Sequence, residues 1–569
     1  MTETQPAQVS YQEVFNCDSD YLQRNACRGE NFYGEHEGKR YCILHYPAEK
    51  DGQRFNLAIE RKRKAENFDF SGVCFPNSAN FKSWVFPKDA DFSHATFNGE
   101  ANFSTSQFLG KAEFRAATFN GYTNFVSIWF HKEVVFSEAN FKQQAVFAHT
   151  KFDQKAGFHF SCFQQQADFG SCVFKAVALF NSTEFKKDAH FYKAIFLQNV
   201  EFNNAKFAEE ACFYSARFDE QANFGSAKFR GVADFNSAEF KSTAELGLAE
   251  FAGQTRFFTT KFIGEADFKS ATFKEMTNFM SASFGNLADF GSANFHSPVY
   301  FDNASFAGDA GFSHATFKDV ARFSSNEKTN VFADGASLNL EFARIDKPER
   351  IAFHGLKLHP HWFVNVDSRK FEFLDVTWLN EINWSRTFSP KAELKSLAGK
   401  VSAPHRLLSV TYRQLAVNAE ENHRYGEALK LRYASMESHR LETSGGFIPW
   451  KLNWWYWLAS GYGESAVRAV LVFAVLVSLF TFSYTKTDFD HSNKTQPAQS
   501  VGDSAAKSNS IKPLGWEDAA IYSLNVAILQ KPEPKPFSTS AKLLVWLETV
   551  LGPAQAALLA LAVRRRFMR

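Results

Sequence analysis

Four residues near the N-terminus have the types and the spacing of metal ligands. Cys17, Cys27, Cys42 and His45 follow one another as C-x9-C-x14-C-x2-H. Thiolate sulfur and imidazole nitrogen are the donors that zinc prefers in tetrahedral structural sites. Such a shell can also hold together a segment whose apolar content is too small for it to fold alone. The spacing therefore predicts a structural zinc site within residues 1–66.

Two other interpretations of this segment stay open. The nine-residue gap is wider than the spacing of about two to four residues usual between paired zinc ligands, so Asp18 or His36 could replace one of the four. The thiols could also be ordinary free cysteines in a loop. The seven cysteines are irregularly placed and no export signal precedes them, which argues for a reducing compartment and against a disulfide framework.

No pattern typical of a catalytic centre occurs in the sequence. The phosphate-binding pattern G-x-x-x-x-G-K, the metalloprotease pattern H-E-x-x-H and the nucleophile pattern G-x-S-x-G are missing from the 569 residues. We therefore expect that the protein is not an enzyme, and we predict no catalytic or cofactor-binding residues. The 63 Lys and Arg residues balance the 61 Asp and Glu residues, so no global charge recruits nucleic acid and no such partner is expected.

A strict repeat of phenylalanine follows the predicted zinc segment. From Phe70 to Phe323 it recurs at alternating steps of five and six, and of the 47 positions in register only Leu246 is not Phe. In a helix these steps would turn successive side chains by about 140° and 240°, which leaves no continuous apolar stripe. In short strands, Phe and the small residue two positions before it point to the same side. The repeat therefore predicts an interior of stacked aromatic rings and alanines.

The repeat units resemble those of a known family. Ala101-Asn102-Phe103, Ala167-Asp168-Phe169, Ala233-Asp234-Phe235 and Ala288-Asp289-Phe290 are similar to the A-(D/N)-(L/F)-x-x unit of pentapeptide repeat proteins. This resemblance implies a mainly β fold, a right-handed quadrilateral β-helix over residues 67–325. The chain departs from the five-residue period by one inserted residue on every second face. We therefore expect bulged alternate corners, about 22 residues per coil, and a rod of about eleven or twelve coils roughly 55 Å long.

The register of the repeat is lost after Phe323. Alternating apolar segments within residues 326–390 predict closing coils that cap the β-helix. His359-Pro360-His361 has ligand-like residues but no third partner nearby, so we interpret it as a turn. From Pro404 the apolar residues recur at steps of three and four, which predicts a helical hairpin within a linker of residues 391–446.

The C-terminal residues have the composition of a membrane module. Residues 447–465 hold four tryptophans, which predicts a helix at the membrane interface. Ala466–Tyr484 and Ala541–Val563 are long and apolar enough to span a lipid bilayer, whereas Trp516–Leu529 is too short. Arginines flank the outer ends of the two spans. We therefore expect a multi-pass protein of the bacterial inner membrane with both termini, and the β-helix, in the cytoplasm.

The order of span, short helix and span in residues 466–569 resembles the two-helix pore module of the potassium-channel superfamily. Trp516–Leu524 is similar to the pore helix and Leu547–Gly552 to the inner helix. The resemblance implies a homo-oligomer, a tetramer by analogy. The T-V-G-Y-G filter is missing and Ile528–Pro534 stands in its place, so potassium selectivity is not predicted. The candidate pore or gating residues are Trp516, Tyr522, Ser523, Glu548 and Gly552, the last at the expected hinge.

Glu548 is the most costly of these residues to place within a bilayer and is therefore a functional candidate. It could face a pore or pair with Lys542. The alternative is that it lies near a membrane interface or meets another subunit.

Three functions are compatible with these features. The leading hypothesis is an ion-channel-like module whose repeat rod acts as a docking or gating domain for an unidentified protein partner. The second is a membrane-anchored interaction scaffold without transport. The third is DNA mimicry, as in pentapeptide repeat proteins that protect gyrase, but this role needs a strongly acidic rod and the near balance of charge argues against it.

Overall fold

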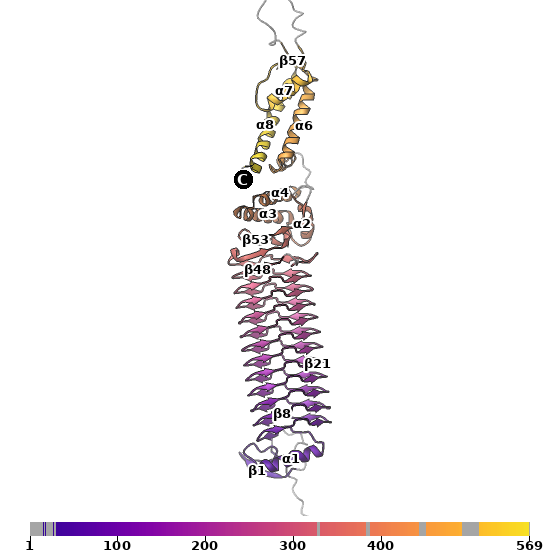
Figure 1. Cartoon of the computed structure of the whole chain (residues 1–569), viewed down its shortest axis with the longest axis vertical. Helices are drawn as coiled ribbons and strands as arrows, with labels where there is room; N and C mark the ends of the chain where they lie inside the picture. Colours follow the sequence, from indigo (N-terminus) through magenta and orange to yellow (C-terminus); the bar gives the residue numbers. More distant parts are fainter. Residues whose placement is uncertain are drawn as a thin grey trace, which may run out of the picture. The chain divides into compact units, whose positions relative to one another are not determined.

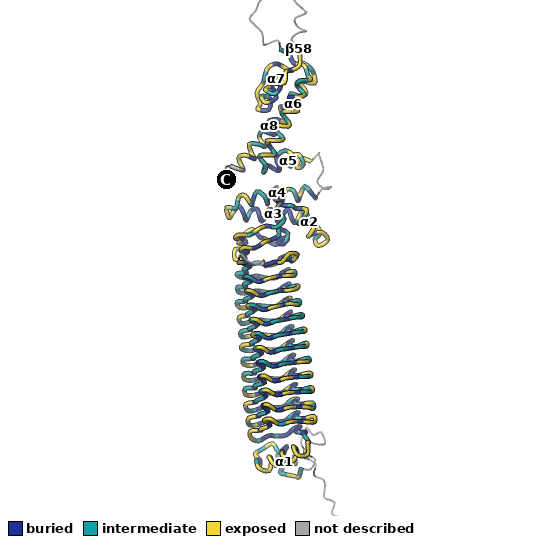
Figure 2. The backbone as a smooth tube through the Cα atoms, turned by 45° about the vertical axis from the view of Figure 1, so that its right-hand side comes forward, coloured by how far each residue is buried: buried dark blue, intermediate teal, exposed yellow. Residues whose placement is uncertain are grey.

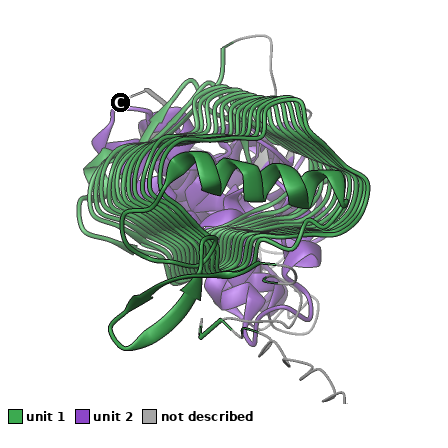
Figure 3. Cartoon of the chain, turned by 90° about the horizontal axis from the view of Figure 1, so that it is seen from below, with its two compact units in different colours: residues 1–358, 365–377 green, residues 359–364, 378–569 purple. Residues whose placement is uncertain are grey.

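The chain forms two compact units, which Figure 3 colours separately. Unit 1 comprises residues 1–358 and 365–377, and unit 2 comprises residues 359–364 and 378–569. The structure is a computed structural model, and it describes residues 15, 17, 18, 27, 30–326, 331–382, 387–442, 451–491 and 511–567.

Unit 1 begins with a small module made of a hairpin and a helix. Its elements are β1 (Phe32–His36), β2 (Lys39–Cys42) and α1 (Gly52–Lys64), with the two strands antiparallel. The Asp51 side chain caps the first turn of α1. Phe55 of α1 is buried, and its ring meets Phe75 edge-to-face at 5.6 Å. The helix therefore lies across the first coil of the structure that follows (Figure 3).

The rest of unit 1 is a β-solenoid with four faces (Figure 1). Each face is a parallel sheet, and the four sheets contain 11, 12, 13 and 14 strands. The strands from β3 (Cys74–Phe75) to β47 (Thr316–Phe317) have two residues each, and β48 is Ala321–Ser324. Each strand pairs with the strand 22 residues later, as Thr96 does with Thr118. The structure confirms the predicted four-sided coil of about 22 residues.

The phenylalanine rings fill the interior of the solenoid. Phe97 stacks on Phe119 of the next coil, with ring centroids 4.7 Å apart and planes 2° from parallel. Within a coil, neighbouring columns meet edge-to-face, as Phe92 and Phe103 do at 5.4 Å. The repeat rings are 2% exposed or less, and Figure 2 shows the buried positions recurring along each coil. Both ring geometries are the favourable ones for aromatic pairs.

Two kinds of corner account for the alternating steps of five and six. Each five-residue corner contains one residue with a left-handed backbone, such as His94 and Thr105, both with φ of 57°. This conformation recurs every eleven residues and is mostly occupied by residues other than glycine. At the six-residue corners the coils approach closely, because a Cβ at Gly99 would lie only 2.6 Å from the Ser78 nitrogen.

Closing coils continue the solenoid beyond Phe323. Their strands are β49 (Leu338–Asn339), β50 (Arg344–Ile345), β51 (Ile351–His354) and β53 (Glu372–Leu374), which extend three of the four sheets. Phe353 stacks on Phe323 at 5.2 Å, and Phe373 stacks on Phe353 at 5.6 Å. The largest sheet thus reaches 14 strands, which exceeds the eleven or twelve coils expected from the repeat alone.

The first part of unit 2 contains the predicted helical hairpin. Its elements are η2 (Pro360–Phe363), β55 (Glu381–Ile382), β56 (Thr387–Phe388), α2 (Pro390–Leu397), α3 (Pro404–Glu421) and α4 (Tyr425–Leu441). The hairpin consists of α3 and α4. A buried pair of serines joins the two helices, since the Ser409 hydroxyl donates to the Ser435 carbonyl at 2.9 Å.

The second part of unit 2 contains the candidate membrane helices. Its elements are α5 (Leu452–Ser460), α6 (Ala466–Tyr484), β57 (Asp488–Asp490), β58 (Ile511–Pro513), α7 (Trp516–Ala527), β59 (Lys535–Pro536) and α8 (Thr539–Phe567). Within the described residues, α6 and α8 are the two helices long and apolar enough to cross a membrane. They contain the two predicted spans.

The predicted interfacial helix is shorter than expected. Residues 447–450 lie outside the described part of the chain, and α5 ends at Ser460. The left-handed Gly461, with φ of 56°, stops the helix there.

The stacked core predicts a large local cost for removing one ring. Phe169→Ala should lower the free energy of local unfolding by about 3 to 5 kcal/mol, because a fully buried aromatic ring is lost. Hydrogen exchange of the amides in the flanking coils measures this energy. Phe160→Ala is the matched control, since Phe160 is 60% exposed and its loss should leave exchange unchanged. Equal effects of the two substitutions would contradict the account of the core.

Candidate functional site

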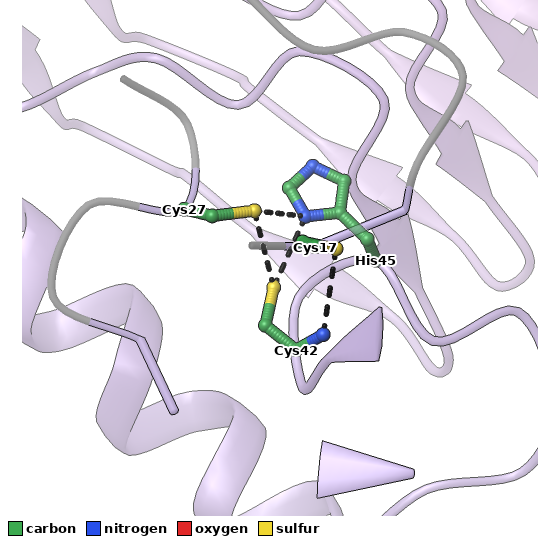
Figure 4. A group of neighbouring side chains, drawn as sticks. All are labelled: Cys17, Cys27, Cys42 and His45. Carbon is green, nitrogen blue, oxygen red and sulfur yellow. Dashed lines mark hydrogen bonds between the residues drawn. The ribbon is translucent and has the colours of Figure 1, made fainter. Parts of the chain in front are cut away.

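The four predicted zinc ligands come together at the N-terminal end of unit 1 (Figure 4). Their ligand atoms all lie within 4.8 Å of one another. The Nδ1 atom of His45 lies 3.0 Å from the Cys27 sulfur and 3.1 Å from the Cys42 sulfur, and these two sulfurs are 3.4 Å apart. A zinc ion with bonds of about 2.3 Å to sulfur needs sulfur separations of about 3.8 Å. The ligands are therefore close to the spacing that zinc needs.

Local structure orients the ligands. Cys42 ends β2, and His45 lies on the turn that follows. The other ring nitrogen of His45, Nε2, donates to the Ser71 carbonyl at 2.8 Å, which leaves Nδ1 facing the sulfurs. The backbone amide of Cys42 donates to the Cys17 sulfur at 3.5 Å. Bonds of this kind fix the ring and support negative charge on sulfur in metal sites.

The thiols influence one another's ionisation. Hydrogen bonds from Cys27 and Cys42 lower the pKa of Cys17, although burial opposes the change. The same network raises the pKa of Cys27, first through its bond with Cys17 and then through Cys42. Burial alone would lower the pKa of His45, but the sulfurs outweigh it and raise that pKa to about 9. The cluster therefore favours a cation among its sulfurs.

The two alternative ligands lie outside the cluster. The Asp18 carboxylate accepts the backbone amide of Arg40 at 2.8 Å. His36 lies on β1, and its Nε2 is 3.9 Å from the carboxylate of the adjacent Glu37. Despite the wide first gap, the cluster is therefore the original set of three cysteines and one histidine.

The cluster joins the N-terminal module to the solenoid. His45 bonds to Ser71, and the Leu44 carbonyl accepts the amide of Cys74 from the first strand of the repeat at 3.0 Å. The buried Lys50 ammonium donates to the carbonyls of Ile43 and Leu44 at 2.8 and 3.0 Å. Burial lowers the pKa of Lys50 to about 8. A metal ion in this cluster would hold the first coil in place.

Glu548 is buried within its own chain. The Tyr484 hydroxyl donates to one carboxylate oxygen at 2.5 Å, and the Ser523 hydroxyl donates to the other. Its partners are therefore hydroxyls of α6 and α7, and the expectation that it pairs with Lys542 or is exposed near an interface is wrong for the described chain. The carboxylate ties α6, α7 and α8 together.

The other pore or gating candidates surround this contact. Tyr522 is buried, and its ring meets Tyr484 edge-to-face at 5.2 Å. Trp516 begins α7 and is exposed. Gly552 lies within the continuous helix α8, beside Pro553. A Cβ on Gly552 would lie 2.8 Å from the Cα of Ala527, so this glycine permits close packing of α8 on α7.

Sequence reasoning missed two polar residues that hold unit 2 together. The Gln555 amide on α8 donates to the carbonyls of Ala459 and Ala469 at 2.8 and 2.9 Å. Glu393 on α2 contacts both His359 and His361, so the sequence His359-Pro360-His361 does have a third partner. Spacing alone could not reveal either contact, because each joins segments that are distant in the sequence.

The cluster predicts a zinc content that depends on its ligands. Full-length protein with Cys42→Ser and His45→Ala should contain one zinc equivalent per chain less than the unaltered protein, because two of four ligands are lost. Metal analysis by mass spectrometry measures the content. Cys74→Ser is the control, since Cys74 lies outside the cluster. Unchanged zinc content in the double variant would show that the four residues do not bind zinc.

Comparison with known proteins agrees with the geometry of the repeat. The family model described as pentapeptide repeats (9 copies) matches residues 81–129, 163–206, 213–261 and 281–325. Comparisons with curated proteins and with solved structures found no match. The chain therefore carries a pentapeptide-repeat β-solenoid, followed by helices of which two are candidates to cross a membrane.

Proposed function

We propose that the protein is a non-enzymatic protein of the bacterial inner membrane whose C-terminal module, assembled from several copies, encloses a water-filled pathway. The pentapeptide-repeat solenoid is its cytoplasmic arm and acts as a docking or gating domain. The arrangement of α7 and the segment that follows it carries this proposal.

The α7 segment enters and leaves at the same end of the module. Strands β58 and β59, which precede and follow it, both pair with β57 at the end of α6. The helix runs from this small sheet between α6 and α8, and its last residue, Ala527, packs against Gly552. Gly552 lies about 20 Å along α8, which is about 43 Å long in total. If α6 and α8 span the bilayer, α7 ends near the middle of the membrane.

The segment after α7 is irregular and exposed at this depth. Ile528 and Leu529 are 57% and 65% exposed, and Gln530, Lys531 and Glu533 are also exposed. Irregular backbone does not occur in contact with lipid tails, because its polar groups find no partners there. It is tolerated only where protein covers it or where it lines a water-filled cavity. Both conditions are met if several copies place these segments around a common axis.

The permeant solute of such a pathway is defined by charge alone. Lys531 and Glu533 would form rings of opposite charge, and rings of charged side chains select among ions. The carbonyl filter of potassium channels is missing, so the proposal is limited to small ions without potassium selectivity.

A membrane-anchored scaffold is the second candidate function. One face of the solenoid has a shallow groove lined by Lys186, Lys206, Lys228 and Arg230, with Glu184 as its acidic residue. Such a surface fits an acidic segment of a partner protein. In this case the two spans only anchor the rod.

Reconstituted protein should conduct ions. Purified full-length protein in liposomes should give ion flux above that of empty vesicles, and Lys531→Glu should shift its preference from anions toward cations. Lys512→Glu is the matched control, because Lys512 is exposed on β58 and lies away from the return segment. Mass measurement in nanodiscs should give an oligomer. A monomer without flux would contradict the pathway and leave the scaffold.

A further inference from the structure

A second cluster of ligand side chains lies in unit 2. It consists of His359 and His361 at the start of η2, together with Glu393 in the first turn of α2. The ligand atoms of all three lie within 4.8 Å of one another. The Nδ1 atom of His359 is 3.0 Å from one carboxylate oxygen of Glu393, and the Nδ1 atom of His361 is 2.5 Å from the other.

The surrounding structure holds these groups in place. Pro360 starts η2, and the two imidazole rings that flank it lie 5.1 Å apart. The backbone amide of His361 donates to Glu393 at 3.0 Å, and the Asn380 amide donates to its other oxygen at 2.5 Å. Glu393 is fully buried, whereas both histidines are partly exposed. The cluster is thus rigid on its carboxylate side and accessible on its imidazole side.

We propose that His359, His361 and Glu393 form a second metal site, which takes a divalent cation such as Zn²⁺ and keeps one coordination position open. Two imidazole nitrogens and one carboxylate oxygen are a donor set used for zinc and for other divalent transition metals. With metal bonds of about 2.1 Å, neighbouring ligand atoms lie about 3.0 to 3.4 Å apart. The separation of 3.0 Å between His359 and Glu393 already has this value.

An unpartnered phenol beside the cluster points to the open position. Tyr412 on α3 is fully buried, and its hydroxyl has no hydrogen-bond partner within the described part of the chain. Burial, and then the charge of Glu393, raises the pKa of Tyr412, so the hydroxyl and the carboxylate lie within electrostatic reach. A buried hydroxyl without a partner is costly. A water molecule bound to the metal would supply the missing partner.

The ionisation of the carboxylate is compatible with this role. Burial would raise the pKa of Glu393, but the hydrogen bonds from His359 and His361 outweigh burial and lower this pKa to about 2. Glu393 is therefore an anion at neutral pH, as a metal ligand must be. When the cation binds, each Nδ1 gives up its proton, which passes to Nε2 or to solvent on the accessible side.

The site is independent of the proposed membrane pathway. It would fix η2 and α2 to each other, together with Asn380, at the start of the segment that leads to the helical hairpin. Its failure would leave the arguments on α7 unchanged, and the absence of ion flux would leave the metal site unchanged.

Metal counting on full-length protein tests the site. Protein with Cys42→Ser and His45→Ala, which lacks the N-terminal ligands, is stripped of metal and loaded with Zn²⁺. We expect one equivalent to remain, and the further change His361→Ala should remove it and weaken Zn²⁺ binding at least 100-fold. His423→Ala is the matched control, because His423 is exposed in the same unit and contacts only Tyr425 in its printed hydrogen bond. Retention of the equivalent after His361→Ala would overturn the assignment.

Cobalt provides a readout that does not alter the second site. Co²⁺ added to the same Cys42→Ser, His45→Ala protein should give visible ligand-field bands without thiolate charge-transfer bands, since the remaining donors are nitrogen and oxygen. Loss of these bands in Glu393→Gln would agree with the proposal. The absence of bound Zn²⁺ and of cobalt bands in folded protein would show that the three groups are a hydrogen-bonded ion cluster only.

Discussion

The stacking of one phenylalanine ring on another is the interaction on which the solenoid depends. Parallel strands on adjacent coils lie about 4.8 Å apart, and rings such as Phe97 and Phe119 stack at 4.7 Å. The spacing of the backbone ladder and that of the aromatic columns are thus the same. One residue added inside a single coil would move a ring out of its column, so every coil must keep 22 residues. Outward positions are free of this constraint and carry varied charges.

A column of identical coils leaves an unsatisfied surface at each end, which a solenoid must cover. At the N-terminal end α1 covers the first coil, and the Cys17, Cys27, Cys42 and His45 cluster bonds to it through Ser71. At the other end the closing coils continue the ring stack through Phe353 and Phe373. Both ends therefore use local devices that the repeat itself does not contain.

The parts of the fold that follow from side-chain periodicity could be predicted from the sequence. The alternation of five and six in the Phe series determines which residues point inward, so the four faces and the pairing of residues 22 apart follow from it. The left-handed corners could not be predicted, because residues as different as His94, Phe160 and Lys193 occupy them and no glycine marks them. The zinc ligands were recognisable because Cys42 and His45 lie on one turn. The partners of Glu393 and Glu548 were not, since the contacts of both depend on helix packing.

The membrane module depends on where the irregular segment after α7 lies. Leu529 and Leu479 are almost equally exposed in the isolated chain, at 65% and 62%, but the account places Leu529 on water and Leu479 of α6 on lipid. Labelling of Leu529→Cys and Leu479→Cys in intact membranes with a hydrophilic thiol reagent that cannot cross the bilayer separates the two surroundings. The account predicts rapid labelling at position 529 and none at position 479. Protection of position 529, or equal labelling of both, would contradict a water-filled pathway.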